Sequence, residues 1–130
     1  MQAAEADPAG GLSVFDEGKF ESRYGDASLM SDLITIFAED APGLMDEVRA
    51  AHSSGDAAEL HRSAHGLKGL VGNYCSERAL ESVTALDRRA RSEDLAGIEE
   101  MIEATAHELE ELGKVLLKFR DSLQETAEVS

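Results

Sequence analysis

The residues of one helical face between positions 95 and 123 follow the most regular pattern in the chain. They stand alternately three and four positions apart, at Leu95, Ile98, Ile102, Thr105, Leu109, Leu112, Leu116, Phe119 and Leu123. This alternation keeps the side chains on one face of an α-helix over about four heptads. The pattern therefore predicts one long helix whose mainly apolar stripe must be covered by other apolar surface.

Two arrangements would cover this stripe. Two copies of the chain could form a coiled-coil dimer, or other helices of the same chain could pack against it. We favour an intramolecular bundle and a monomer, because further amphipathic helices of the chain would otherwise lack a partner surface. Composition also favours helices over sheets, since only 5% of the residues are aromatic and Ala, Leu and Glu are plentiful.

Two helices are predicted before the centre of the chain. Apolar residues within 14–24 indicate a brief first helix that a glycine cap at Gly25 should end, and this helix should cover one end of a bundle. Residues 27–52 repeat apolar side chains at helical spacing and predict one long helix. We expect a bend at Pro42, because proline lacks an amide hydrogen and crowds the carbonyl four residues earlier.

Two more helices follow, joined by a tight connection. Asp56 can cap a third helix that continues to residue 73 or 74, and Glu59 can complete a capping box. Ser76 is a candidate cap of a fourth helix. Its expected inward-facing residues are Ala79, Leu80, Val83, Leu86 and Ala90. Because the connection is short, these two helices should be antiparallel neighbours.

The third helix carries a second stripe of unusual composition. Its apolar face holds Leu60, Ala64, Leu67 and Val71. At about 100° per residue, His61, His65, Lys68 and Gly72 form another stripe whose centre lies about 100° away, with Gly69 just beyond it. His65 is therefore predicted to point toward solvent.

Glycines at 66, 69 and 72 work against a helix here. Each costs ~1 kcal/mol relative to alanine inside a helix, or roughly 3 kcal/mol together, so something should require them. Gly69 and Gly72 follow His65 by four and seven positions and lie on its side of the helix. They would leave the imidazole open to a bulky partner, although close packing between helices is an alternative reason for them.

An exposed imidazole beside a lysine suits phosphoryl chemistry. With an ordinary pKa near ~6.5, the ring is largely a free base at neutral pH and can act as a nucleophile. Lys68, about one turn after His65, supplies a cation for the phosphoryl oxygens. Residues at this spacing are consistent with a histidine that carries phosphate.

The motif at positions 64–72 resembles the signature of histidine-containing phosphotransfer (HPt) domains of bacterial multistep phosphorelays. It reads Ala64-His65-x-Leu67-Lys68-Gly69-x-x-Gly72. A weaker resemblance extends from about residue 14 to 119. The resemblance implies an all-α fold, an antiparallel four-helix bundle with a short additional N-terminal helix.

The resemblance also implies a function. His65 would accept a phosphoryl group from an aspartyl phosphate of a response-regulator receiver domain and pass it to another receiver, or work with a hybrid sensor histidine kinase. Lys68 would stabilise the phosphoryl group, while His61, Gly69 and Gly72 would lie at the partner-binding surface. Mg²⁺ would be held by the receiver only, so the domain needs no cofactor of its own.

Two other functions are open from the residues. His61 and His65, four positions apart on one helical face, could ligate a metal ion, although no third ligand is near in sequence. The chain could instead be a structural bundle with the long helix as an interaction surface. It contains no glycine-rich nucleotide-binding loop and no kinase-like catalytic stretch, so we expect no autokinase activity.

Charge and segment composition complete the prediction. The net charge of -15 argues against nucleic acid or an anionic membrane as a partner. Residues 62–91 hold six basic and three acidic residues, a local +3 that could attract a carboxylate-rich partner.

Without a signal sequence or a membrane span, a cytoplasmic location is expected. We assign residues 1–12 to a disordered leader, 13–124 to the bundle and 125–130 to a frayed tail.

Overall fold

A computed structural model describes residues 11–129, and their side chains as far as residue 125. Most of the leader expected at 1–12, and Ser130, lie outside the described residues. The described chain forms five helices: α1 (Glu17–Tyr24), α2 (Ala27–Ser54), α3 (Ala57–Val71), α4 (Glu77–Arg91) and α5 (Ile98–Val129). Helix α5 therefore includes residues 125–129, which we had expected to lie in a frayed tail.

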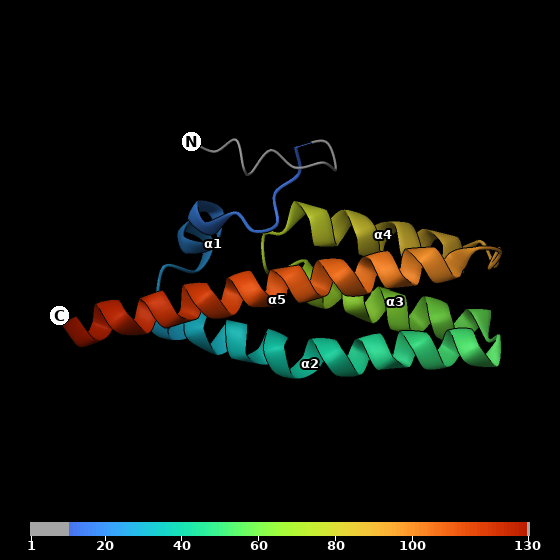
Figure 1. Ribbon diagram of the computed structural model, residues 1–130, viewed down its shortest axis with the longest axis horizontal. Coiled ribbons are helices and arrows are strands. Elements are labelled where there is room, and N and C mark those ends of the chain that lie inside the picture. Colours follow the sequence, from blue (N-terminus) through green and yellow to red (C-terminus); the bar gives the residue numbers. More distant parts are fainter. Residues whose placement is uncertain (1–10, 130) are drawn as a thin grey trace.

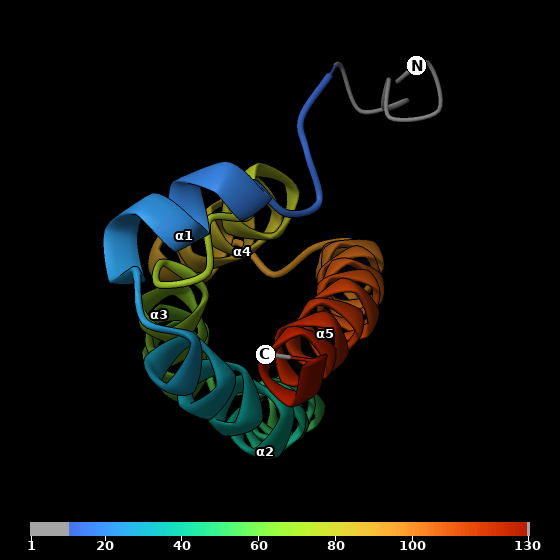
Figure 2. The ribbon, with the colours of Figure 1, turned by 90° about the vertical axis from the view of Figure 1, so that its left-hand side faces the viewer.

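Helices α2 to α5 run up and down side by side, and each packs against two others around a common core (Figures 1 and 2). Around the bundle the order is α3, α2, α5, α4. Helix α1 lies across one end, near the connection between α3 and α4 (Figure 2). This is the predicted all-α, antiparallel four-helix bundle with a short additional helix.

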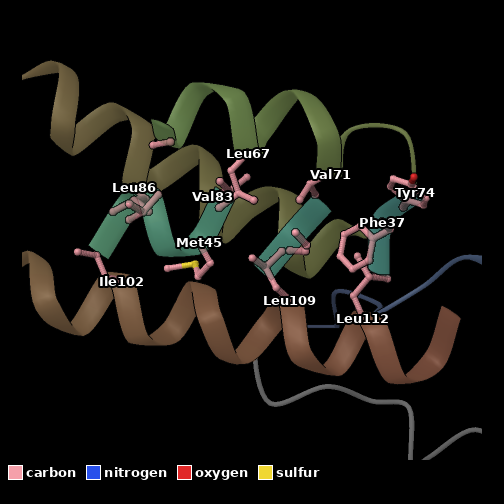
Figure 3. Close-up of a cluster of buried hydrophobic side chains, with 14 of the residues drawn as sticks. Phe37, Met45, Leu67, Val71, Tyr74, Val83, Leu86, Ile102, Leu109 and Leu112 are labelled. Atoms are coloured by element: carbon pink, nitrogen blue, oxygen red, sulfur yellow. The ribbon is translucent and has the colours of Figure 1, made fainter. Parts of the chain in front are cut away.

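The long stripe of α5 is buried within the same chain. Ile98, Leu112 and Leu116 have no exposed surface, and Ile102 is 3% exposed. Figure 3 shows Ile102, Leu109 and Leu112 pointing toward side chains of the other bundle helices. Each fully buried aliphatic side chain contributes about 1.5–3 kcal/mol. The stripe thus belongs to an intramolecular core, as we favoured over a coiled-coil dimer.

Helix ends follow the local signals with three differences. Helix α5 begins at Ile98, so Leu95, which the heptad pattern placed in this helix, precedes it. Asp56 accepts a hydrogen bond from the amide of Glu59 at 3.0 Å, and Ser76 caps α4 through the amide of Ala79 at 3.1 Å. The capping box is not closed, because the amide of Asp56 donates to Ala51 and the Glu59 carboxylate pairs with Arg62. Helix α3 ends at Val71 rather than at residue 73 or 74.

Helix α2 runs through Pro42 without interruption, as predicted, and changes direction near its middle (Figure 1). Gly25 ends α1 in the left-handed region, with φ 67°. None of the helices in residues 11–129 is long and apolar enough to cross a membrane.

Tyr74 fixes the end of the bundle beneath α1. Its ring packs against Phe37 at 5.0 Å and Phe20 at 6.1 Å between centroids, and its hydroxyl donates to the Leu33 carbonyl at 2.5 Å. The residue is 1% exposed. Burial, with smaller contributions from Tyr24 and Asp40, raises the pKa of the Tyr74 phenol to about 12 from 10.0.

This pKa predicts a loss of stability in alkali. Between about pH 10 and 12 the unfolded chain releases the Tyr74 proton while the folded chain keeps it, so the free energy of unfolding should fall by about 2–3 kcal/mol. In Tyr74→Phe this fall should be absent, with about 1 kcal/mol lost at pH 8 through the missing hydrogen bond. Urea denaturation from pH 8 to 12 measures both. Parallel pH profiles for the two proteins would contradict the assignment.

Candidate functional site

Helix α3 presents His65 to solvent because its opposite flank is locked into the core. Leu60, Ala64 and Leu67 have no exposed surface, and Val71 is 1% exposed. Figure 3 shows Leu67 and Val71 pointing into the bundle. The His65 side chain, turned about 100° from Ala64, is 65% exposed. The helical wheel predicted this orientation.

The glycines that follow His65 are not needed for packing inside the molecule. A Cβ atom at Gly69 would meet nothing within 4 Å, and one at Gly66 would meet only Leu44 Cδ2 at 3.9 Å, an ordinary contact. The close-packing explanation therefore fails for both. Their effect is an outer surface of α3 without side chains at positions 66 and 69, close to the imidazole.

Gly72 differs from the prediction in its position. It caps α3 instead of lying inside the helix, and its φ of -59° is open to any residue. A Cβ there would meet backbone oxygens of Lys68 and Gly69 at 3.5 and 3.7 Å, which are ordinary contacts. The helix-interior cost of glycine thus applies to Gly66 and Gly69 alone, about 2 kcal/mol together.

Lys68 lies one turn beyond His65 and is half-buried. No other residue of the described chain forms an ion pair with its ammonium group. A lysine that is already paired would have to break that contact before it could bind a ligand oxygen. Lys68 can bind an anion beside His65 without this cost.

A buried carboxylate of α4 lies beneath the two histidines. The Asp87 side chain is 3% exposed, its Oδ1 is 3.3 Å from His61 Nε2, and its Oδ2 is 3.7 Å from His65 Nδ1. The two imidazole rings stack, with centroids 5.9 Å apart and planes at 22°. His61, 32% exposed, therefore lies where we predicted, next to His65.

Arg91, also from α4, joins the same group. Its Nη2 donates to Asp87 Oδ2 at 3.4 Å, and its Nε donates to His61 Nε2 at 3.4 Å. The Arg91 side chain is 65% exposed. The site therefore contains a guanidinium group as well as the lysine that the motif supplies.

Sequence reasoning missed Asp87 and Arg91 as site residues. It placed Leu80 on the inner face of α4, but Leu80 is 38% exposed, whereas Asp87 is 2% exposed. Asp87 follows Val83 by four positions, within the buried register of Ala79, Val83 and Ala90. The sequence signal that could have identified Asp87 is a carboxylate at a position that the pattern of α4 assigns to its apolar face, in the helix that follows the histidine helix.

Metal ligation by His61 and His65 receives no support from the geometry. Within residues 11–129, no group of three or more His, Cys, Asp or Glu side chains is arranged to hold a metal ion.

Comparison with known proteins identifies the family. The Hpt domain model matches residues 32–115, which is most of the chain and includes the whole of α3 and α4. The chain belongs to the Hpt domain family. No curated protein sequence matches it significantly.

A solved structure confirms the fold of this Hpt domain. The chain is similar to histidine-containing phosphotransfer protein B from Pseudomonas aeruginosa PAO1, with a TM-score of 0.74 and 22% sequence identity. The match covers 83% of this chain and 95% of that protein. Membership of the family gives the general function, histidine phosphotransfer in a phosphorelay. Hpt proteins are phosphocarriers that work with receiver domains and kinases.

The open space at Gly69 predicts that alanine stabilises the domain. Gly69→Ala should raise the free energy of unfolding by about 1 kcal/mol, because alanine favours the helix and its methyl group meets no neighbour. Urea denaturation measures the change. Gly25→Ala is the matched control and should destabilise the domain, because φ at Gly25 is 67°. A destabilised Gly69→Ala would mean that this glycine serves the fold.

Proposed function

We propose that His65 accepts a phosphoryl group from the aspartyl phosphate of one receiver domain and transfers it to the aspartate of another. The observation that carries this proposal is the 65% exposure of the His65 side chain, on a helix whose following glycine has open space above it. A receiver must bring its own active site onto the imidazole, and this surface permits that approach.

Each nearby residue has a proposed role. Lys68 binds the phosphoryl oxygens during transfer, where a fixed cation stabilises developing charge. Gly69 lets the receiver's loops come close, and Gly72, which is exposed, keeps the surface clear beyond it. His61 lines the site beside His65, with the two rings stacked.

The receiver supplies the remaining catalytic parts. It would hold the Mg²⁺ that supplies positive charge for the phosphoryl group, so the Hpt domain needs no cofactor of its own and has no autokinase activity. The domain acts as a monomer in the cytoplasm. The burial of the α5 stripe within one chain supports the monomer, because this stripe is not available to a second copy.

Replacement of His65 tests the phosphate acceptor. Incubation of His65→Gln with a ³²P-labelled receiver should give no labelled domain, whereas the wild type takes up label that is acid-labile and base-stable. His107→Gln, an exposed histidine on α5, is the matched control and should accept phosphate normally. In Lys68→Ala the transfer rate should fall by roughly 10- to 100-fold without reaching zero. Undiminished labelling of His65→Gln would exclude His65 as the acceptor.

A large side chain at Gly69 tests the approach of the receiver. Gly69→Leu should fold normally, because the space above Gly69 is open. Its transfer rate should nevertheless fall by about a hundredfold, because a leucine displaces the receiver from the distance that transfer needs. Circular dichroism checks the fold, and the labelling assay gives the rate. A wild-type rate in Gly69→Leu would show that no partner comes near this face of α3.

A further inference from the structure

A groove runs along the outside of the bundle between α2 and α5. Its floor is formed by Phe37, Met45 and Leu109, and its volume is about 440 Å³. The walls carry small or apolar residues, Ala38, Ala41 and Pro42 of α2 and Ala106, Gly113 and Leu117 of α5. Helix α3, which carries His65, packs on the other side of α2 (Figure 2). The groove is therefore separate from the surface around His65.

Gly113 keeps this groove open without serving the packing of the helices. A Cβ atom at Gly113 would meet only Phe37 Cε2 at 3.8 Å, which is an ordinary contact. Glycine in the interior of α5 costs about 1 kcal/mol relative to alanine. As at Gly69, helix stability is lower at a position where a side chain would fill open space.

Pro42 gives the groove a hydrogen-bond acceptor. Inside α2 the carbonyl of Ala38 would normally accept from the amide at position 42, but proline has no amide hydrogen. Both residues line the groove and are exposed. The Ala38 carbonyl therefore lacks its usual helical donor and can accept a hydrogen bond from a molecule that lies in the groove.

One end of the groove is acidic. Asp46 of α2 and Glu110 of α5 line this end and form no ion pair in the described part of the chain. Arg49 also lines it, but its guanidinium is already paired with Glu103. A positive group of a bound molecule would therefore be attracted to this end.

The other end is basic. Lys114 lines the groove one turn after Glu110, and its 72% exposed side chain makes one long ion pair, at 3.4 Å. Arg120 lies one turn beyond Leu117 and donates to Thr35 Oγ1 at 2.9 Å. It pairs with no carboxylate of the described residues, and its Nε is buried without an acceptor. An anionic group would be attracted to this end.

An α-helix matches both the length and the charges of the groove. Residues 106–117 of α5 span about 16 Å, or three helical turns. A helix carries partial positive charge at its N-terminus and partial negative charge at its C-terminus, which complements the two ends. The helix also satisfies its own backbone groups, whereas an extended peptide would find a single free carbonyl, that of Ala38.

We propose that this groove binds an amphipathic helix of a partner protein, with its N-terminus at Asp46 and Glu110 and its C-terminus at Lys114 and Arg120. The bound helix runs parallel to α5 and places an apolar stripe on the floor of the groove. Because the groove lies away from His65, this partner can stay bound while another protein approaches the imidazole. The inference does not depend on the proposed function of His65.

Binding of a synthetic peptide, followed by fluorescence anisotropy, tests the groove. The probe is a cross-linked helix of about 14 residues with a leucine stripe, lysines in its first turn and glutamates in its last. Gly113→Leu, which places a side chain in the groove, should weaken binding about tenfold. A peptide with lysines and glutamates exchanged should bind wild type about tenfold more weakly, and Lys114→Gln should reduce this difference.

Gly69→Leu is the matched control, because it makes the same change in open space on α3. It should bind the probe like wild type, whereas Gly113→Leu should accept phosphate from a receiver at the wild-type rate. Equal binding of the two peptides, undiminished binding to Gly113→Leu, or slow phosphate transfer to folded Gly113→Leu overturns the proposal. If Gly113→Leu does not fold, the exchanged peptide and Lys114→Gln decide alone.

Sedimentation equilibrium distinguishes a partner helix from a second copy of the chain. The wild-type domain should sediment as a monomer at the concentrations of the binding assay. A wild-type dimer that Gly113→Leu abolishes would assign the groove to self-association and overturn the proposal.

Discussion

The rotation of α3 about its own axis is the constraint on which the site depends. Leu60 and Leu67 have no exposed surface, and burial of each contributes about 1.5–3 kcal/mol, so the helix cannot turn without exposing them. A turn of about 100°, one residue, would carry the His65 ring into the core. The contacts of α3 with α2 and α4 keep it in this orientation. The hydrophobic core thus fixes the direction in which the solvent-exposed imidazole of His65 points.

The surface around His65 reduces the stability of the domain. Gly66 and Gly69 each weaken the interior of α3 by about 1 kcal/mol relative to alanine, although their neighbours would tolerate a methyl group. Caps offset part of the loss, since the side chains of Asp56 and Ser76 each bind a helix amide and contribute about 1 kcal/mol. Helix stability is thus lower on the outer face of α3 beside His65 and is partly regained at the ends of the helices.

The local sequence pattern was sufficient to predict most of the fold and the part of the site that lies on α3. His65, Lys68 and Gly69 share α3, so their spacing alone determines their relative positions. Asp87 and Arg91 reach the site from α4, and their position depends on the register of α4 against α3, which no spacing within either helix encodes. The same register turned Leu80 outward, where a hydrophobicity pattern alone placed it inside.

The structure also shows how many of the basic side chains in residues 62–91 are already bound within the protein. Two of the six basic side chains serve the fold, because Arg78 pairs with Glu108 at 2.8 Å and Arg89 donates to backbone carbonyls of residues 94 and 96. Arg62 pairs with Glu59 on the same helix. Arg91 pairs with Asp87, so the cations of this segment that form neither an ion pair nor such a backbone hydrogen bond within the described chain are Lys68 and Arg88. The local charge of +3 therefore overstates the number of cations in this segment that are free to bind an acidic partner.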